Sequence, residues 1–110
     1  MLPARNRAAR ALFTMLRARD RNTKKLEGAE FEIFFRGGSY PVKVGIVVSK
    51  RTAKKAVLRN RIKRIVAEAI KDELDKIGGQ LLIVVKSDIS MLKTDDVKKK
   101  IFGVLEKLND

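Results

Sequence analysis

The sequence contains no cysteine, no histidine and no tryptophan. Without cysteine there is no disulfide framework and no thiolate nucleophile, and without histidine the most common general base and zinc ligand is missing. The chain has no apolar run of about 18 residues that could span a membrane, and Met1-Leu2-Pro3-Ala4 leads straight into arginines rather than into the apolar part of a secretion signal. We therefore expect a protein of the reducing cytoplasm with no membrane partner.

Acidic residues are scarce in the first part of the chain. Residues 1–64 hold 18 Lys and Arg against four Asp and Glu, a net charge of +14, whereas residues 65–110 hold eight against nine. A large charge of one sign opposes folding through self-repulsion, so its concentration in one part of the chain indicates a binding surface for a polyanion. A generally basic soluble protein would spread its lysines evenly.

The chain also lacks the usual constellations of an independent enzyme. There is no phosphate-binding loop of the GxxxxGK type, and no pair of carboxylates lies within an apolar segment. Asp72-Glu73 and Asp95-Asp96 are adjacent pairs at helix positions where acids are expected because of solubility or the helix dipole. We therefore expect neither catalytic residues nor a metal site in the protein itself.

The apolar pattern predicts the order helix, strand, strand, helix, strand, helix in a single domain over residues 1–110. The first helix is expected over residues 7–22, and a polar connection over residues 22–28 follows it. Strands are predicted at residues 30–35 and 42–48. The glycines between these strands predict that the two form a hairpin.

The second half of the chain supplies two helices and one strand. The long helix has Thr52 as its expected N-cap and Gly78-Gly79 at its end, and Thr94 is expected to cap the last helix. The continuous apolar run 81–85 predicts a strand buried on both faces. The predicted fold class is therefore α+β: one small sheet with helices against it, a sandwich. If the second and third strands are parallel, general chirality predicts a right-handed crossover.

Residues 49–64 join the second strand to the long helix, and eight of these sixteen residues are Lys or Arg with no acid among them. On the helix an apolar stripe lies beside a polar stripe, so the packing that orients the helix also orients the polar side chains. The apolar stripe comprises Leu58, Ile62, Ile65, Val66, Ala69, Ile70 and Ile77, and the polar stripe comprises Asn60, Lys63, Arg64 and Lys71. The amide of Asn60 suits a base edge or a ribose hydroxyl, and Phe13 and Phe34 could stack on unpaired bases.

At these residues the chain resembles the protein component of bacterial ribonuclease P. Val44-Gly45-Ile46-Val47-Val48-Ser49-Lys50 matches that family's VGxxVSK strand, and Arg59-Asn60-Arg61-Ile62-Lys63-Arg64 matches its RNRxKR signature at the family's distance from the strand. Leu2-Pro3, Arg5-Asn6-Arg7 and Lys55-Ala56-Val57 also fall in the family's order. The resemblance covers nearly the whole chain.

The resemblance implies an α-β sandwich similar to the second domain of ribosomal protein S5, with a left-handed crossover around the long helix in place of the right-handed default. It also implies a holoenzyme with a large catalytic RNA that removes the 5′ leader from precursor tRNA, with Mg²⁺ held mainly by the RNA. No obligatory protein partner is expected.

The resemblance further implies two sites. In the family, the signature helix and the loop before it face the catalytic RNA, and a cleft between the first helix and the sheet takes the single-stranded leader. By position, contact with the catalytic RNA falls to Lys50, Arg51, Lys54, Lys55, Arg59, Asn60, Arg61, Lys63 and Arg64. Contact with the leader falls to Phe13, Arg17, Phe34, Lys43 and Val47.

Two other interpretations fit the same charge. A ribosomal-protein-like structural RNA binder would show no preference for precursor tRNA over mature tRNA. A nonspecific binder of DNA or of anionic membranes would be almost insensitive to loss of the Asn60 amide.

Overall fold

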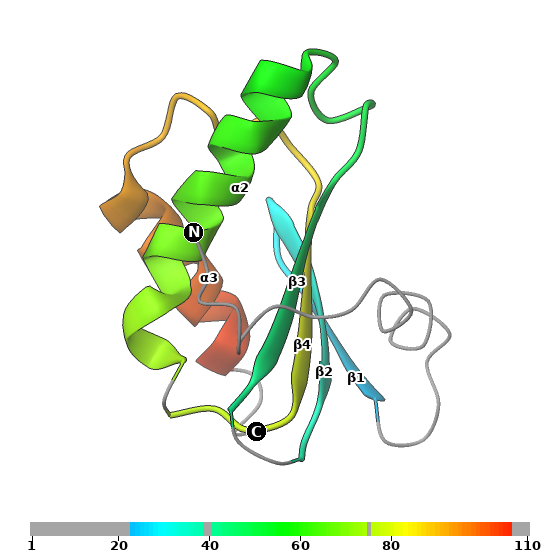
Figure 1. Ribbon diagram of the computed structural model, residues 1–110, viewed down its shortest axis with the longest axis vertical. Helices are drawn as coiled ribbons and strands as arrows, with labels where there is room; N and C mark the ends of the chain where they lie inside the picture. Colours follow the sequence, from blue (N-terminus) through cyan, green and yellow to red (C-terminus); the bar gives the residue numbers. More distant parts are fainter. Residues whose placement is uncertain (1–22, 39–40, 75, 107–110) are drawn as a thin grey trace.

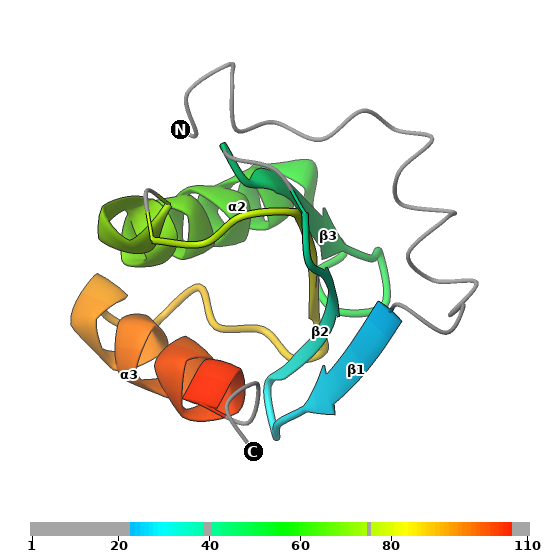
Figure 2. The same ribbon diagram turned by 90° about the horizontal axis from the view of Figure 1, so that it is seen from below.

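The computed structural model of the chain describes residues 23–38, 41–74 and 76–106. Its helices and strands are β1 (Thr23–Glu27), β2 (Phe31–Arg36), β3 (Lys43–Val48), α2 (Ala56–Ile70), the short 3-10 helix η2 (Lys71–Glu73), β4 (Gln80–Val85) and α3 (Thr94–Leu105). In the described part of the chain, α2 and α3 pack against one face of the sheet, as Figures 1 and 2 show. The predicted α+β class is confirmed, whereas the first predicted helix, with Phe13 and Arg17, lies outside the described residues.

The four-stranded sheet has the order β1-β2-β4-β3, so β2 and β3 are not neighbours. The predicted hairpin of these two strands is therefore wrong, because β4 lies between them, antiparallel to β2 and parallel to β3. The physical reason is that β4 is apolar on both faces: Leu82 and Ile83 are both 0% exposed, and a central position in the sheet covers both. The prediction that this strand is buried on both faces is confirmed.

β1 occupies residues for which a polar connection is predicted, and that prediction is wrong. The strand forms an edge of the sheet and pairs antiparallel with β2. Leu26 is its only buried apolar side chain, so hydrophobicity gives little signal for a strand. Lys25 instead forms ion pairs with Glu27 at 2.9 Å and with Glu32 on β2 at 3.8 Å. Charged side chains are common on edge strands, since they oppose pairing with a second chain.

The connection from β3 through α2 to β4 is left-handed (Figures 1 and 2). The general rule favours the right hand, so the default prediction is wrong and the expectation from the family resemblance is confirmed. With β4 on the β2 side of β3, a right-handed connection would place α2 on the other face of the sheet. The left-handed path instead keeps α2 on the same face as α3, and the two helices are in contact there. One shared core is thereby formed.

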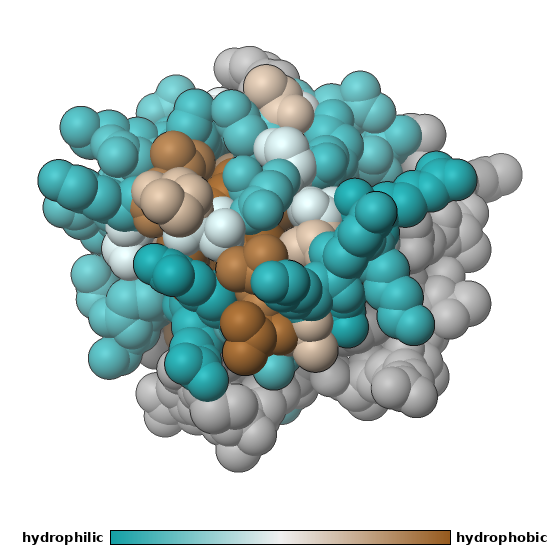
Figure 3. All heavy atoms as spheres, turned by 90° about the horizontal axis from the view of Figure 1, so that it is seen from above, coloured by the Kyte–Doolittle hydropathy of each residue, from teal (hydrophilic) through white to brown (hydrophobic). Residues whose placement is uncertain are grey.

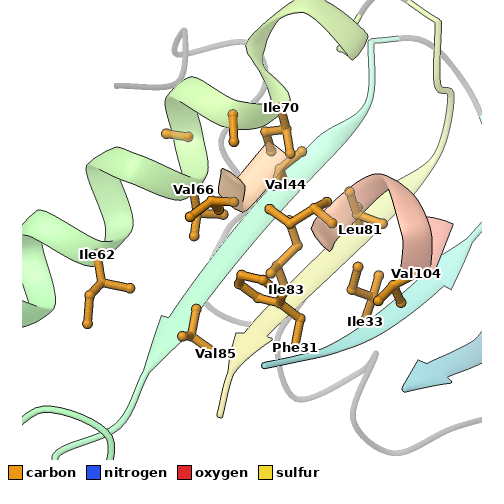
Figure 4. Packing of buried hydrophobic residues seen from close by; sticks show 14 of the residues in the cluster. Phe31, Ile33, Val44, Ile62, Val66, Ile70, Leu81, Ile83, Val85 and Val104 are labelled. Atoms are coloured by element: carbon orange, nitrogen blue, oxygen red, sulfur yellow. The ribbon is translucent and has the colours of Figure 1, made fainter. Parts of the chain in front are cut away.

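That core lies between the sheet and the two helices (Figure 4). Ile62, Val66 and Ile70 of α2 point towards Val44 and the apolar side chains of β4. Of the predicted apolar stripe, Ile62, Val66, Ala69 and Ile70 are buried, while Leu58, Ile65 and Ile77 pack as partly buried residues. Burial of this stripe orients the remaining faces of α2.

The predicted helix ends are less accurate than the helices themselves. α2 begins after Lys55, which takes extended backbone angles, so Thr52 is not the N-cap. Regular α-helix ends at Ile70 and continues only as η2, well before the predicted glycine stop. α3 begins one residue earlier than predicted, because Lys93 is its N-cap residue and Thr94 already belongs to the helix.

Gly79 adopts a φ of 101°, a conformation that side chains with a Cβ rarely take. A Cβ at this position would collide with the carbonyl oxygen of Arg36 at the end of β2. The Gly79 carbonyl also accepts a hydrogen bond of 2.9 Å from the backbone N–H of Lys43. This glycine therefore ties together the ends of three strands.

We expect Gly79→Ala to lower the free energy of unfolding by about 1–3 kcal/mol, because it adds both backbone strain and a clash. Gly103→Ala is the matched control: Gly103 lies within α3, and nothing lies within 4 Å of a Cβ added there. That substitution should raise stability by about 0.5–1 kcal/mol through helix propensity. Urea unfolding of both variants measures the difference, and equal effects would contradict the assignment.

Candidate nucleic-acid interface

The cationic segment, defined as residues 49–64, lies at the end of the molecule where β3 passes into α2. Figure 3 looks onto this end and shows long hydrophilic side chains around small apolar patches. Eight of the nine residues implicated by the signature and its preceding loop are exposed: Lys50, Arg51, Lys54, Lys55, Asn60, Arg61, Lys63 and Arg64. The ninth, Arg59, is half-buried. The structure therefore exposes eight of the nine predicted residues to solvent.

The loop before α2 forms a hydrogen-bonded turn that is not part of the helix. The backbone N–H groups of Thr52 and Ala53 donate to the carbonyl of Ser49 at 3.1 and 3.2 Å. The Thr52 hydroxyl donates to the carbonyl of Val85 at 3.2 Å, which fastens the loop to the end of β4. Ala53 is only 4% exposed and is part of the core. The lysines and arginine around this turn therefore project from an anchored backbone.

Arg59 holds the same loop from the helix side. Its Nη1 donates to the carbonyl of Ala53 at 3.0 Å and to the carbonyl of Lys54 at 2.7 Å. Hydrogen bonds from a charged donor are stronger than neutral ones, so this brace stabilises the loop against the first turn of α2. The spacing in the sequence gives no signal for this role, because carbonyl partners are specified only by the loop conformation.

The polar stripe of α2 is exposed as predicted. Asn60, Lys63 and Arg64 of α2 and Lys71, the first residue of η2, are all exposed beside the buried stripe. The first turn of α2 contains no acidic side chain. The positive end of the helix dipole therefore adds to the charge of the segment.

The second face of the sheet, defined as the face opposite α2 and α3, carries the described part of the predicted leader site. Its side chains come from paired positions on the four strands: Thr23, Lys25, Glu27, Glu32, Phe34, Arg36, Lys43, Gly45, Val47, Gln80, Leu82 and Val84. Phe34 is 4% exposed and packs with Leu82, Val47 and Val84. Phe34 is therefore buried on this face, whereas Lys43 and Val47 are half-buried.

The lysines of α3 are mostly engaged by acidic side chains. Lys98 pairs with Asp72 at 3.5 Å, and Lys100 pairs with Glu30 at 3.0 Å. Lys98 also lies 5.5 Å from the centroid of the Phe102 ring. Lys98 and Lys100 are thus paired with η2 and with the β1–β2 turn. Lys99 is exposed, so its substitution is a suitable control for the loss of one surface charge.

Among the described residues, no group of three or more acidic side chains could hold a metal ion. The pKa of Asp88 lies below its ordinary value because the side chain and the backbone N–H of Ser90 hydrogen-bond to the carboxylate. That shift favours the charged form of an exposed carboxylate. In the same ranges, no helix is long and apolar enough to cross a membrane.

Together, the mixed sheet, the left-handed crossover and the exposed cationic helix define a class of small basic α+β proteins with a cationic surface at one end of the sheet. The chain belongs to the Ribonuclease P family, whose model matches residues 4–109.

Individual relatives agree with this assignment. The chain is 37% identical over 68 residues to a ribonuclease P protein component of Bacillus cereus, and 26% identical over 87 residues to one of Xanthomonas oryzae. These matches cover 59% and 78% of this chain, and 57% and 60% of the respective relatives. The chain thus spans a little over half the length of the relatives it matches.

Solved structures agree on the fold. The ribonuclease P protein from Thermotoga maritima is similar with a TM-score of 0.76 at 25% identity, covering 94% of this chain and 97% of that one. The protein from Staphylococcus aureus gives a TM-score of 0.78 at 20% identity, covering 96% of both chains.

The brace at Arg59 leads to a specific expectation. Arg59→Ala should lower the free energy of unfolding by about 1 kcal/mol and speed amide hydrogen exchange in residues 50–55, because two loop carbonyls lose a charged donor. The control is Arg61→Ala, which removes an exposed arginine of the same motif and should change stability by less than about 0.5 kcal/mol. Hydrogen exchange measured by mass spectrometry tests this prediction. Equal exchange of the loop amides in the two variants would show that Arg59 does not stabilise the loop.

Proposed function

We propose that the chain is the protein subunit of a ribonuclease P holoenzyme. It binds the catalytic RNA and the 5′ leader of precursor tRNA, and it assists the Mg²⁺-dependent endonucleolytic removal of the leader that gives the mature tRNA 5′ end. The observation that carries the proposal is the exposed row of Arg, Lys and Asn side chains on α2, in a chain of the Ribonuclease P family. The site of action is the cytoplasm, and no further protein partner is required.

In this proposal the cationic segment binds the phosphate backbone of the catalytic RNA. Arginine suits phosphates because its guanidinium group can donate two parallel hydrogen bonds, and lysine adds point charges. Asn60 lies between Arg59 and Arg61 and presents an amide that can both donate and accept. The anchored loop and the packed helix hold these groups in place before RNA arrives, which limits the entropy lost on binding.

The chemistry of hydrolysis is assigned to the RNA. The described residues include no group of acids suited to a metal ion, so Mg²⁺ is assigned to RNA phosphates in the holoenzyme. The protein then contributes by neutralising phosphate charge and by holding the substrate. Both effects allow the reaction to proceed at a lower concentration of Mg²⁺.

The leader is assigned to the second face of the sheet. Phe34, Val47, Leu82 and Val84 form an apolar cluster there, and Lys43 lies two residues from Gly45 on the same face. Because Phe34 is almost fully buried, its ring packs inside the apolar cluster and is not exposed for stacking on a base. Val47 and Val84 are the half-buried members that a base can reach.

The first test is reconstitution with the catalytic RNA. At low Mg²⁺, adding the protein should increase the rate of cleavage of precursor tRNA, and the holoenzyme should bind precursor tRNA more tightly than mature tRNA. A structural binder of ribosomal RNA would give neither effect. An unchanged cleavage rate would reject the proposal.

A second test uses the salt dependence of binding to the catalytic RNA. Arg61→Ala should weaken binding and reduce the slope of log affinity against log salt concentration by about 1, since one fewer phosphate contact releases counterions. Lys99→Ala removes the same charge from the exposed side of α3 and should leave the slope unchanged. Asn60→Ala should weaken binding several-fold with little change in slope, because it removes a neutral hydrogen-bonding group. Equal slopes for Arg61→Ala and Lys99→Ala would place Arg61 outside the interface.

A further inference from the structure

Val57 is an exposed apolar residue within the cationic segment. Its relative exposure is 74%, and Met91 is the only other large hydrophobic side chain exposed in the described part of the chain. Single exposed valines are common on protein surfaces and need no explanation by themselves. The surroundings of Val57 are unusual, because eight of the sixteen residues in its segment are Lys or Arg and none is acidic.

Val57 lies on the side of α2 opposite the buried stripe. It precedes Ile62 by five residues and Val66 by nine, so a helix places it about 140° and 180° away from these buried side chains. Asn60 and Arg61 follow Val57 by three and four residues, which makes them its neighbours on the helix surface. All three side chains are exposed. An RNA that contacts Asn60 and Arg61 together therefore also covers Val57.

The side chain of Val57 favours the face of a base over a phosphate group. A phosphate oxygen placed over its methyl groups would lose water and gain no hydrogen bond, which is costly for a charged group. The flat face of a base, by contrast, gains by covering apolar surface. Neighbouring base pairs cover these faces inside a duplex, so a base that reaches a protein side chain in this way is unpaired and unstacked.

We propose that Val57 receives the face of one unpaired base of the catalytic RNA, with the Asn60 amide at the edge of that base and Arg61 at an adjacent phosphate. The proposal rests on the proposed function and deepens it, since it names the kind of nucleotide that the cationic segment recognises. The buried stripe of α2 holds the three side chains at a fixed spacing before the RNA arrives. A purely phosphate-binding helix would accept any duplex, whereas this arrangement selects an RNA with an unpaired base at one place.

The first measurement is the affinity of the protein for the catalytic RNA over a range of salt concentrations. Val57→Ala should bind about threefold to tenfold more weakly, because an apolar contact loses two methyl groups. The slope of log affinity against log salt concentration should stay unchanged, because no phosphate contact is lost. Val57→Ile keeps an apolar β-branched side chain and should bind as the unmodified protein does. Met91→Ala removes an exposed apolar side chain outside the cationic segment and should also leave binding unchanged.

The stability of the free protein separates a contact with RNA from a structural role. Val57 is mostly exposed and alanine has the higher helix propensity, so thermal unfolding of Val57→Ala should show equal or higher stability. Weaker RNA binding by an equally stable variant then reflects the lost contact. A lower unfolding temperature would show that Val57 supports the fold, and it would overturn the assignment.

A second measurement identifies the base. The sequence has no cysteine, so Val57→Cys provides a single attachment point for a photoactivatable aryl azide. Crosslinks to the catalytic RNA should fall on an unpaired nucleotide. Removing the base of that nucleotide should weaken binding of the unmodified protein by the same factor as Val57→Ala, and it should not weaken binding of Val57→Ala further. Crosslinks confined to duplex, or losses that add when both changes are made, would overturn the contact with a base.

The outcomes separate this proposal from the proposed function. If the protein stimulates cleavage of precursor tRNA but Val57→Ala binds the catalytic RNA as tightly as the unmodified protein, the contact is overturned while the function stands. If Val57→Ala reduces the salt slope as Arg61→Ala does, or if Met91→Ala weakens binding equally, the contact is likewise overturned. If the unmodified protein fails to stimulate cleavage at low Mg²⁺, the proposed function itself fails.

Discussion

Packing of α2 against β3 and β4 is the constraint on which the rest of the structure depends. Ile62, Val66 and Ile70 are buried against the sheet, and each is at most 2% exposed. Their burial leaves the helix almost no freedom to rotate about its axis, because turning it would expose apolar surface at about 25 cal/mol per Å². Asn60, Lys63 and Arg64 are therefore held outward. A row of charges that repel one another is stabilised in one orientation by apolar contacts underneath it.

The sheet separates two polar ends of the molecule. At one end, the loop held by Thr52 and Arg59 carries exposed lysines and an exposed arginine. At the other end, Gln80 and its neighbours line a small cavity. The apolar cluster around Phe34 lies between them on the second face. A single strand laid along that face would meet a charged end, an apolar middle and a polar end in that order.

The sequence predicted the fold class, the apolar stripe of α2 and the central burial of β4, because each depends on periodicity or on continuous hydrophobicity within one segment. It failed at β1, where ion pairs of Lys25 replace apolar packing as the visible stabilising contacts. It also failed at the pairing of β2 with β3, since glycines between two strands indicate a turn but do not say which strand the chain pairs with next. The prediction of Thr52 as N-cap is wrong because its hydroxyl donates a hydrogen bond to the carbonyl of Val85, which is 33 residues away.

The sequence by itself determined the charge asymmetry, the surface row on α2 and the family, since these depend on residue identity and spacing along one chain. Only the tertiary structure decided which strands pair, the brace from Arg59 to the loop and the cavity beside Gln80. The cavity arises where segments distant in sequence meet, and the brace depends on a loop conformation that the hydrogen bond from Thr52 to Val85 anchors. The partner of a carbonyl, the neighbour of a strand and the space between three strand ends are set by the packing of the whole domain, which no local pattern encodes.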